Sequence, residues 1–201
     1  MCLSTVMTPT LRRASCHCAL ILIAFAASSA FAQKPRILGP IGGSREVALQ
    51  KHGHPLARPE FDRGAADPAM RLNYVTMVLK PTLAQQADLA TLLIQQQDRS
   101  SAGYHQWLTP EQFADRFGLA ASDIAVIESW IEAQGLRIED TARGRNWIAF
   151  SGTVAQIQRA LHTEIRRFLV DGTAHYANAA DPSLPAALAD VVRFFRGLDD
   201  F

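Results

Sequence analysis

Apolar residues recur along the chain at spacings that predict alternating strands and helices from about Met70 onward. Residues 72–79 are a run rich in Val, Leu and aromatic residues, which predicts a strand that ends at Pro81. Thr82 is placed to cap a helix that continues to about Gln97. The apolar face of this helix is predicted to carry Leu83, Ala87, Ala90 and Ile94, with Leu89 and Leu93 beside it.

A second helix start follows a polar loop. Thr109 can cap this helix, Pro110 suits its first turn, and Gln112 sits where a capping-box side chain reaches back. Gly118 is expected to provide the left-handed residue that ends it. We interpret this stretch as an ordered loop leading into a short helix, and not as a catalytic motif.

The next predicted helix is capped by Ser122 and stopped by Gly135. Its apolar stripe contains Ile124, Ile127 and Ile131, broadened by Trp130. Two strands are predicted after it, at residues 136–140 and 147–151, around the turn-forming residues 143–146.

The last part of the chain predicts a helix, a hairpin and a final helix. Thr153 and Gln156 form a capping box for a helix whose inward residues are Val154, Ile157 and Leu161. Asp171 and Gly172 form a hairpin turn between predicted strands at 165–170 and 173–177. Pro185 starts the final helix, to about Val192, and a tail follows it at residues 197–201.

This order of elements fits an α+β sandwich with helices on one face of a mostly antiparallel sheet. We assign residues 70–197 to this single domain. Residues 33–69 are punctuated by glycine and proline and predict an extended, flexible leader. His52 and His54 lie in that leader; they can be interpreted as a metal-binding pair or as solvated side chains, and we expect the second.

Residues 1–32 have the composition of a secretory signal peptide. Arg12 and Arg13 precede an apolar run at residues 19–27, and Ala30-Phe31-Ala32 has the form of a cleavage site before Gln33. A membrane anchor is the alternative, but the apolar run is shorter than the roughly 20 residues that span a bilayer. We therefore expect a secreted or periplasmic protein.

Charge and cysteine content exclude several functions for the processed chain. All three cysteines, at positions 2, 16 and 18, lie in the predicted signal peptide, so neither disulfides nor thiolate metal sites are expected. Loss of Arg12 and Arg13 leaves acidic residues one in excess of basic ones. Neither nucleic acid nor membrane is therefore an expected partner after cleavage. The sequence also has no phosphate-cradling glycine loop, and we predict no cofactor and no metal.

The sequence offers no recognisable catalytic set. It contains no Gly-x-Ser-x-Gly motif, and the processed chain has no cysteine nucleophile. Glu128 and Glu132 lie one helical turn apart, but without a nucleophile they are better explained as a solvated face. An enzyme with an unrecognised site is the weakest interpretation of this chain, and no catalytic residue is proposed.

Several motifs, in order, resemble the pro-kumamolisin activation domain, the N-terminal prosegment of sedolisin-type serine-carboxyl peptidases. They are residues 92–98, the signature from Tyr104 to Gly118, Trp130 with Gly135, residues 150–153, residues 176–178 and residues 184–192 with 197–198. The resemblance covers residues 72–201. It marks as family positions, with structural or interface roles, Tyr104, His105, Trp107, Leu108, Thr109, Phe113, Phe117, Gly118, Ser151, Gly152 and Asn178.

The resemblance implies a ferredoxin-like fold that lies across the active-site cleft of a catalytic domain, in the same chain or split from it. Such a prosegment is expected to assist folding and to keep the peptidase latent until autocatalytic removal at acidic pH. We expect the family's catalytic Ser, Glu and Asp domain to be missing from this chain, and Ser151-Gly152-Thr153 is not its Gly-Thr-Ser motif. Residues 198–201 are expected to start the exit linker. The alternative is a free-standing secreted inhibitor of proteases, and the DNA beyond the codon for Phe201 would distinguish the two.

Histidine and tryptophan residues have two interpretations each. His105, His162 and His175 are candidate pH sensors, since protonation would add charge and weaken packing against an enzyme surface; the alternative is a structural role. Trp107, Trp130 and Trp147 lie in apolar segments and are expected in the core and not on a binding surface.

Overall fold

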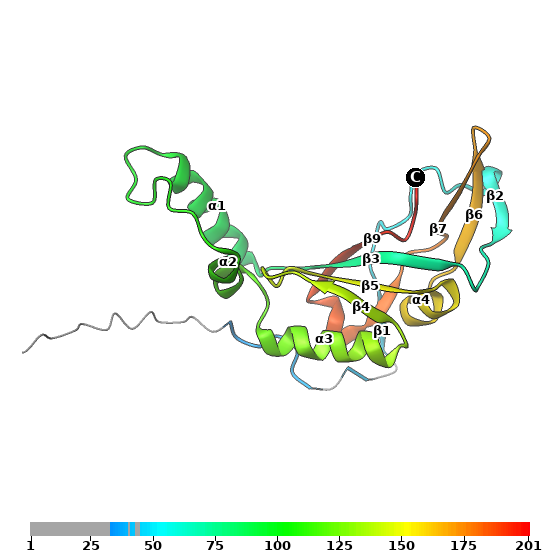
Figure 1. Cartoon of the computed structure of the whole chain (residues 1–201), viewed down its shortest axis with the longest axis horizontal. Helices are drawn as coiled ribbons and strands as arrows, with labels where there is room; N and C mark the ends of the chain where they lie inside the picture. Colours follow the sequence, from blue (N-terminus) through cyan, green and yellow to red (C-terminus); the bar gives the residue numbers. More distant parts are fainter. Residues whose placement is uncertain (1–32, 40, 43–44) are drawn as a thin grey trace, which may run out of the picture.

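The fold is built on a four-stranded antiparallel sheet near the centre of Figure 1. The computed structural model describes residues 33–39, 41–42 and 45–201. The strands lie in the order β4 (Arg137–Thr141), β5 (Trp147–Thr153), β3 (Arg71–Leu79), β9 (Val192–Arg196). In the chain, α3 (Ala121–Ala133) precedes β4 and α4 (Val154–Leu161) follows β5, which gives the β-α-β-β-α-β order. The predicted α+β class and ferredoxin-like sandwich are confirmed.

The main core lies between this sheet and the two helices α3 and α4. Met77 on β3 pairs with Ile148 on β5 and with Phe195 on β9, and all three are buried. The predicted stripe of α3 is buried against them, with Ile127 and Ile131 in the same cluster. The pattern of α3 was therefore sufficient to identify its inward face.

The local signals at helix ends are mostly confirmed. Capping boxes are present at Thr109 with Gln112 and at Thr153 with Gln156, and Gly135 is left-handed with φ of +77°. The predicted cap at Ser122 is wrong, because α3 begins at Ala121 and no side chain caps it.

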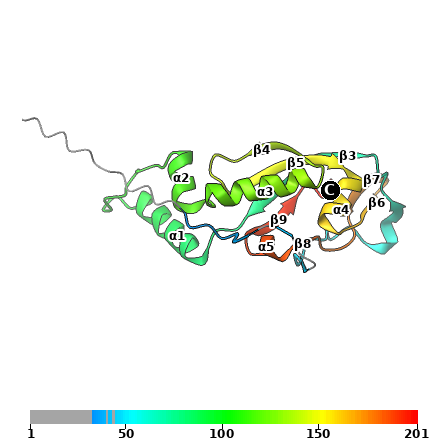
Figure 2. The same ribbon diagram turned by 90° about the horizontal axis from the view of Figure 1, so that it is seen from below.

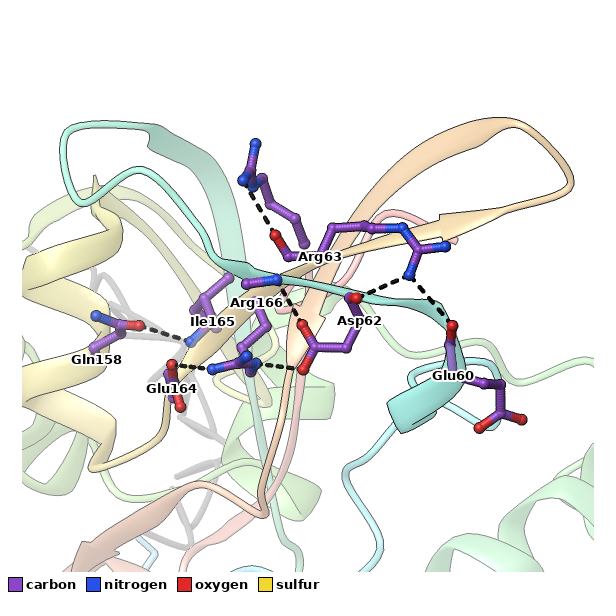
Figure 3. A network of polar contacts seen from close by, with 9 residues as sticks. Glu60, Asp62, Arg63, Gln158, Glu164, Ile165 and Arg166 are labelled. Atoms are coloured by element: carbon purple, nitrogen blue, oxygen red, sulfur yellow. Dashed lines mark hydrogen bonds and ion pairs between the residues drawn. The ribbon is translucent and has the colours of Figure 1, made fainter.

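A second sheet, in the order β2-β6-β7, extends from one end of the first. Its strands are β2 (Asp62–Ala65), β6 (Ile165–Val170) and β7 (Thr173–Asn178). The predicted hairpin is confirmed, since Asp171 and Gly172 both have positive φ values, 50° and 80°, as a two-residue turn of this kind requires. Arg166 on β6 pairs with Asp62 on β2 and with Glu164, as Figure 3 shows.

The expectation that ordered structure begins near Met70 is wrong. β1 (Glu46–Ala48) pairs with β8 (Ser183–Pro185), and the 3-10 turn η1 (Pro59–Phe61) leads into β2. Ile37 and Leu49 are buried in the main core. These segments take their order from strands more than 100 residues away in sequence, a signal that local periodicity does not carry.

The predicted final helix is also largely wrong. α5 (Ala186–Ala189) has four residues, and the chain then forms β9, the edge strand beside β3. Phe195 is buried opposite Met77. Pairing of residues 192–196 with β3 and burial of this phenylalanine limit the helix to the alanine-rich residues 186–189.

Two helices form an arm that stands away from the sheet, at the left of Figures 1 and 2. We define the arm as α1 (Leu83–Gln97), α2 (Pro110–Phe117) and the loop between them. The predicted boundaries of α1 are confirmed, but its predicted apolar face does not pack on the core. Leu92 and Gln96 are the buried residues of α1, whereas Leu83, Ala87, Ala90, Leu93 and Ile94 are exposed.

The predicted signal peptide, with its three cysteines, lies outside the described residues. Among residues 33–39, 41–42 and 45–201, the structure contains no helix with the length and apolar character needed to cross a membrane.

Candidate interaction surface

The second part of the family signature, from Thr109 to Gly118, forms the base of the arm. Thr109 accepts a hydrogen bond from the Gln112 amide and starts α2, and the rings of Phe113 and Phe117 lie 5.2 Å apart on its inner side. Gly118 follows with φ of −78°, so the predicted left-handed conformation is wrong. A glycine is needed there for space, since a Cβ atom would lie 2.5 Å from the carbonyl oxygen of Gly144. The arm therefore rests on the β4–β5 turn through direct backbone contact.

Three ion pairs fix the direction of the arm. Arg143 and Arg145 on the β4–β5 turn pair with Glu111 and Asp115 of α2, each at 2.6 Å. Arg116 binds Asp88 of α1 with two hydrogen bonds, and this guanidinium lowers the pKa of the Asp88 carboxyl. Each exposed ion pair contributes little stability. Because the three pairs attach both ends of α2 to its neighbours, they define the orientation of this short helix.

The tip of the arm presents a row of aromatic rings. The rings of Tyr104 and His105 stack at 3.8 Å, and those of His105 and Trp107 at 5.7 Å. Gln96 holds this loop, because its buried side chain donates to the carbonyl oxygen of Gln106 and its own carbonyl oxygen accepts from the His105 amide. The prediction that Trp107 belongs to the core is wrong, since 68% of its surface is exposed.

One face of α1 is also apolar and exposed. Leu83 and Ile94 are 84% and 70% exposed, and Leu93 beside them is 50% exposed. Helical spacing places residues 83, 87, 90 and 94 on one face, so the sequence pattern identified a real apolar face but not its environment. We call Leu83, Leu93, Ile94 and Trp107 the arm surface.

A groove separates the arm from the sheet. It has a volume of about 190 Å³, and its lining includes Val78, Leu89, Phe113 and Arg145. Val78 lies opposite Trp147 and Phe194, so these three half-buried side chains share the sheet face that points away from Met77 and the core. We call the arm surface, the groove and this sheet face the candidate interaction surface.

Sequence comparisons identify the family to which this fold belongs. The family described as "Pro-kumamolisin, activation domain" matches residues 61–201. This chain belongs to the pro-kumamolisin activation domain family. It is 31% identical over 145 residues to xanthomonalisin from Xanthomonas sp. (strain T-22), which covers 71% of this chain and 17% of the relative. It is 27% identical over 155 residues to kumamolisin from Bacillus sp. (strain MN-32), which covers 77% of this chain and 27% of the relative.

The other signature positions of this pro-kumamolisin activation domain make contacts that support the fold. Ser151 is buried; its hydroxyl donates to Glu139, lowering the pKa of that carboxyl, and accepts from Arg71. A Cβ atom on Gly152 would lie 2.4 Å from a methyl group of Leu136. Asn178 donates to the carbonyl oxygens of His52 and Ala180, and so ties β7 to the leader. Leu108 lies half-buried between the aromatic tip and α2.

The three candidate pH-sensing histidines lie far apart on the activation domain. His105 is exposed at the arm tip, and His162 is the left-handed residue that ends α4. Nε2 of His162 lies 3.8 Å from Glu46, and Nδ1 of His175 lies 3.5 Å from Asp200. The structure therefore brings two of the three histidines close to carboxylates, and it does not gather them into one cluster.

The sequence analysis did not predict two features of the structure. One feature of the sequence indicates the exposure of Leu83, Leu93 and Ile94: apolar residues are spread widely around α1 and do not form a single narrow stripe. The contact of Phe201 with His54 and His175 had no local signal, because it joins segments 26 and more residues apart.

Proposed function

We propose that this chain is the prosegment of a secreted sedolisin-type serine-carboxyl endopeptidase and that it binds the catalytic domain through the candidate interaction surface. The observation that carries the proposal is the arm surface. It exposes four large apolar side chains on a support that capping, ion pairs and the Gly118 contact hold in place. Exposed apolar residues gathered in this way are typical of protein–protein contact sites.

The catalytic domain is the occupant that the comparisons favour. The chain spans 17% of xanthomonalisin and 27% of kumamolisin, so most of each relative lies outside the matched region. If the activation domain buries the arm surface against the folded peptidase, each partner stabilises the other. Binding to the folded peptidase and not to the unfolded one shifts the folding equilibrium toward the folded state, which is chaperone action. The same contact would hold the domain across the active site and inhibit it until removal at acidic pH.

Inhibition in trans tests the proposal. The chain from Gln33 is purified and added to a mature sedolisin-type peptidase, and peptide hydrolysis is measured against its concentration. We expect saturable inhibition that weakens at least tenfold in Ile94→Asp, because a charge would be buried at the contact. The matched control is Ala125→Asp, at an exposed position of α3, which should inhibit like the parent chain. Equal potency of both variants would exclude the arm surface as the binding site.

Chaperone action has a separate readout. The catalytic domain is unfolded in denaturant and diluted with or without the chain, and recovered activity is measured after the prosegment has been removed in acid. We expect higher recovery with the parent chain than with Ile94→Asp. Equal recovery without any added chain would remove the chaperone part of the proposal and leave inhibition standing. Whether the partner belongs to the same polypeptide or a separate one is read from the coding frame.

We further propose that the protein is exported and cleaved before Gln33. Apart from the sequence pattern, the position of Gln33 supports this: its side-chain amide donates to the carbonyl oxygens of Asp115 and Arg116 at the end of α2. These are helix-end acceptors without partners within the helix. The first residue after the proposed cut would thus be part of the folded domain. Mass spectrometry of the exported protein tests it, and a retained N-terminal segment would contradict it.

A further inference from the structure

The side chain of Phe201 lies between two histidine rings. Its ring stacks on His54 at 4.2 Å with an interplanar angle of 6°, and on His175 at 4.4 Å with an angle of 17°. Phe168 of β6 contacts it from a third side, at 6.3 Å between ring centroids. His54 comes from the leader and His175 from β7, so the aromatic sandwich joins the leader and the residues before and at Phe201 to the second sheet.

Asp200 fixes the backbone of the same segment to β7. Its amide donates to the carbonyl oxygen of Tyr176 at 3.2 Å, and its Oδ1 accepts from the Tyr176 amide at 2.7 Å. Nδ1 of His175 lies 3.3 Å from the Asp200 carbonyl oxygen and 3.5 Å from its Oδ1. Because β7 is the edge strand of its sheet, the segment covers hydrogen-bonding groups that would otherwise face solvent.

We propose that His54, His175 and Tyr176 form a seat for the segment Asp199–Phe201, and that protonation of His175 tightens this seat. The ligand class is an acidic stretch followed by an aromatic residue, here supplied by the chain itself. The seat is a property of this domain alone; its role in holding the segment that leads out of the prosegment rests on the proposed function.

The geometry determines the sign of the pH effect. A charged His175 ring gains an ion pair with Asp200 and a cation–π contact with Phe201. The stacking of His54 on Phe201 needs no charge, and Nδ1 of His54 accepts a hydrogen bond from the Leu56 amide, which a protonated Nδ1 cannot accept.

Both basic and acidic groups surround the seat. Lys51, His52 and Arg193 line a hollow with His54 and Asp199, so basic groups lie near the His54 ring and the Asp199 carboxylate. Burial raises the pKa of the Tyr176 hydroxyl, and the charges of Asp200 and Asp199 add to this, so both carboxylates lie near β7. The Asp200 carboxylate lies next to His175 itself, so a charge on His175 is expected to tighten the seat.

This sign is the reverse of the simple expectation that charged histidines loosen the domain. At mildly acidic pH the seat would hold Asp199–Phe201 in one conformation against β7. Release of the prosegment in acid would then depend on groups other than His175.

Hydrogen exchange of the Asp200 and Tyr176 amides tests the seat, using the chain from Gln33 at pH 8 and pH 5.5. Protection factors remove the intrinsic pH dependence of exchange. We expect protection to rise roughly two- to fivefold at pH 5.5, the gain typical of an exposed ion pair or cation–π contact. The amides of Val75 and Met77 in β3 serve as the internal standard of folding.

Four variants separate the parts of the seat. His175→Phe keeps a ring but no charge and should abolish the pH dependence. His54→Phe should retain it, and Phe201→Ala should lose protection at both pH values. His162→Asn, at the end of α4, is the matched control and should behave like the parent chain. A Gly-Ser tail added after Phe201 removes the free carboxylate from the segment and should leave the result unchanged.

Two results would overturn the proposal. One is protection that falls on acidification, and the other is protection that survives Phe201→Ala. Because no peptidase is present in this experiment, either result leaves the proposed function untouched, and a failure of inhibition leaves the seat untouched.

Discussion

Nε of Arg166 on β6 lies 2.6 Å from Oδ2 of Asp62 on β2, so one ion pair joins positions 104 residues apart. Figure 3 shows that the same guanidinium also binds Glu164. Asp62 accepts a further hydrogen bond from the Gly64 amide. The hydrogen bond from Arg166 is the main cause that lowers the pKa of Asp62, followed by that from Gly64. The pair attaches the leader to the second sheet.

The stability of the domain should therefore fall in acid partly through Asp62. Because its folded-state pKa is lowered, its contribution is present above the unfolded value, about 3.9, and is lost as pH falls through the lower folded value. We expect Asp62→Asn to be less stable than the parent near pH 6 and to lose less stability from pH 5 downward. Urea unfolding against pH measures this. The control is Asp140→Asn, at an exposed position of β4, in which the unfolding free energy should change with pH as it does in the parent chain.

Gly118→Ala should destabilise the domain by about 1–3 kcal/mol. The added Cβ atom would meet carbonyl oxygens of Gly144 at 2.5 Å and Ala114 at 2.9 Å, both backbone atoms that cannot rotate away. Gly42→Ala is the control, since no atom lies within 4 Å of its added Cβ. Equal unfolding midpoints of the two variants would show that the arm shifts without cost.

Replacement by alanine should affect stability at Trp130 and inhibition of the peptidase at Trp107. Trp130 is 7% exposed and its loss should cost about 3–5 kcal/mol of unfolding free energy. Trp107 is 68% exposed, and its loss should change stability by less than about 0.5 kcal/mol but weaken inhibition of the peptidase. Unfolding by denaturant and the inhibition assay separate the two effects. A large stability loss in Trp107→Ala would mean that the arm tip is packed in solution.

Asp123→Ala should release the segment around Ile37. The Asp123 side chain is buried, and its two oxygens accept from the amides of Arg36 and Ile37 at 2.8 and 3.0 Å. Removing this acceptor leaves buried donors without a partner, at a cost of about 1–3 kcal/mol. Hydrogen exchange of the two amides should accelerate, whereas Glu132→Ala on the same helix should leave them protected. Unchanged protection in Asp123→Ala would assign the anchoring to Ile37 packing alone.

Local signals predicted the elements whose determinants lie within a few residues. The capping boxes at Thr109 and Thr153 and the Asp171-Gly172 turn are each encoded by neighbouring side chains, and all three are present. Elements that depend on distant partners were missed. β9 forms because Phe195 is buried opposite Met77, and β1 forms because β8 offers it an edge.

The interaction surface could be predicted only in part, for a similar reason. The signature residues were found through the family resemblance, and the helical pattern of α1 placed Leu83 and Ile94 on one face. Their exposure depends on where α1 is anchored, which the contacts of α2 with the β4–β5 turn decide. An apolar helix face is the same in sequence whether it covers a core or awaits a partner.

The position of β9 has a consequence for synthesis. β3, at the centre of the main sheet, has β5 on one side and β9 on the other. A nascent chain on the ribosome cannot complete this sheet until residues 192–196 have left the exit tunnel. The domain thus remains open through nearly all of its own translation, and it closes only when its last strand becomes available.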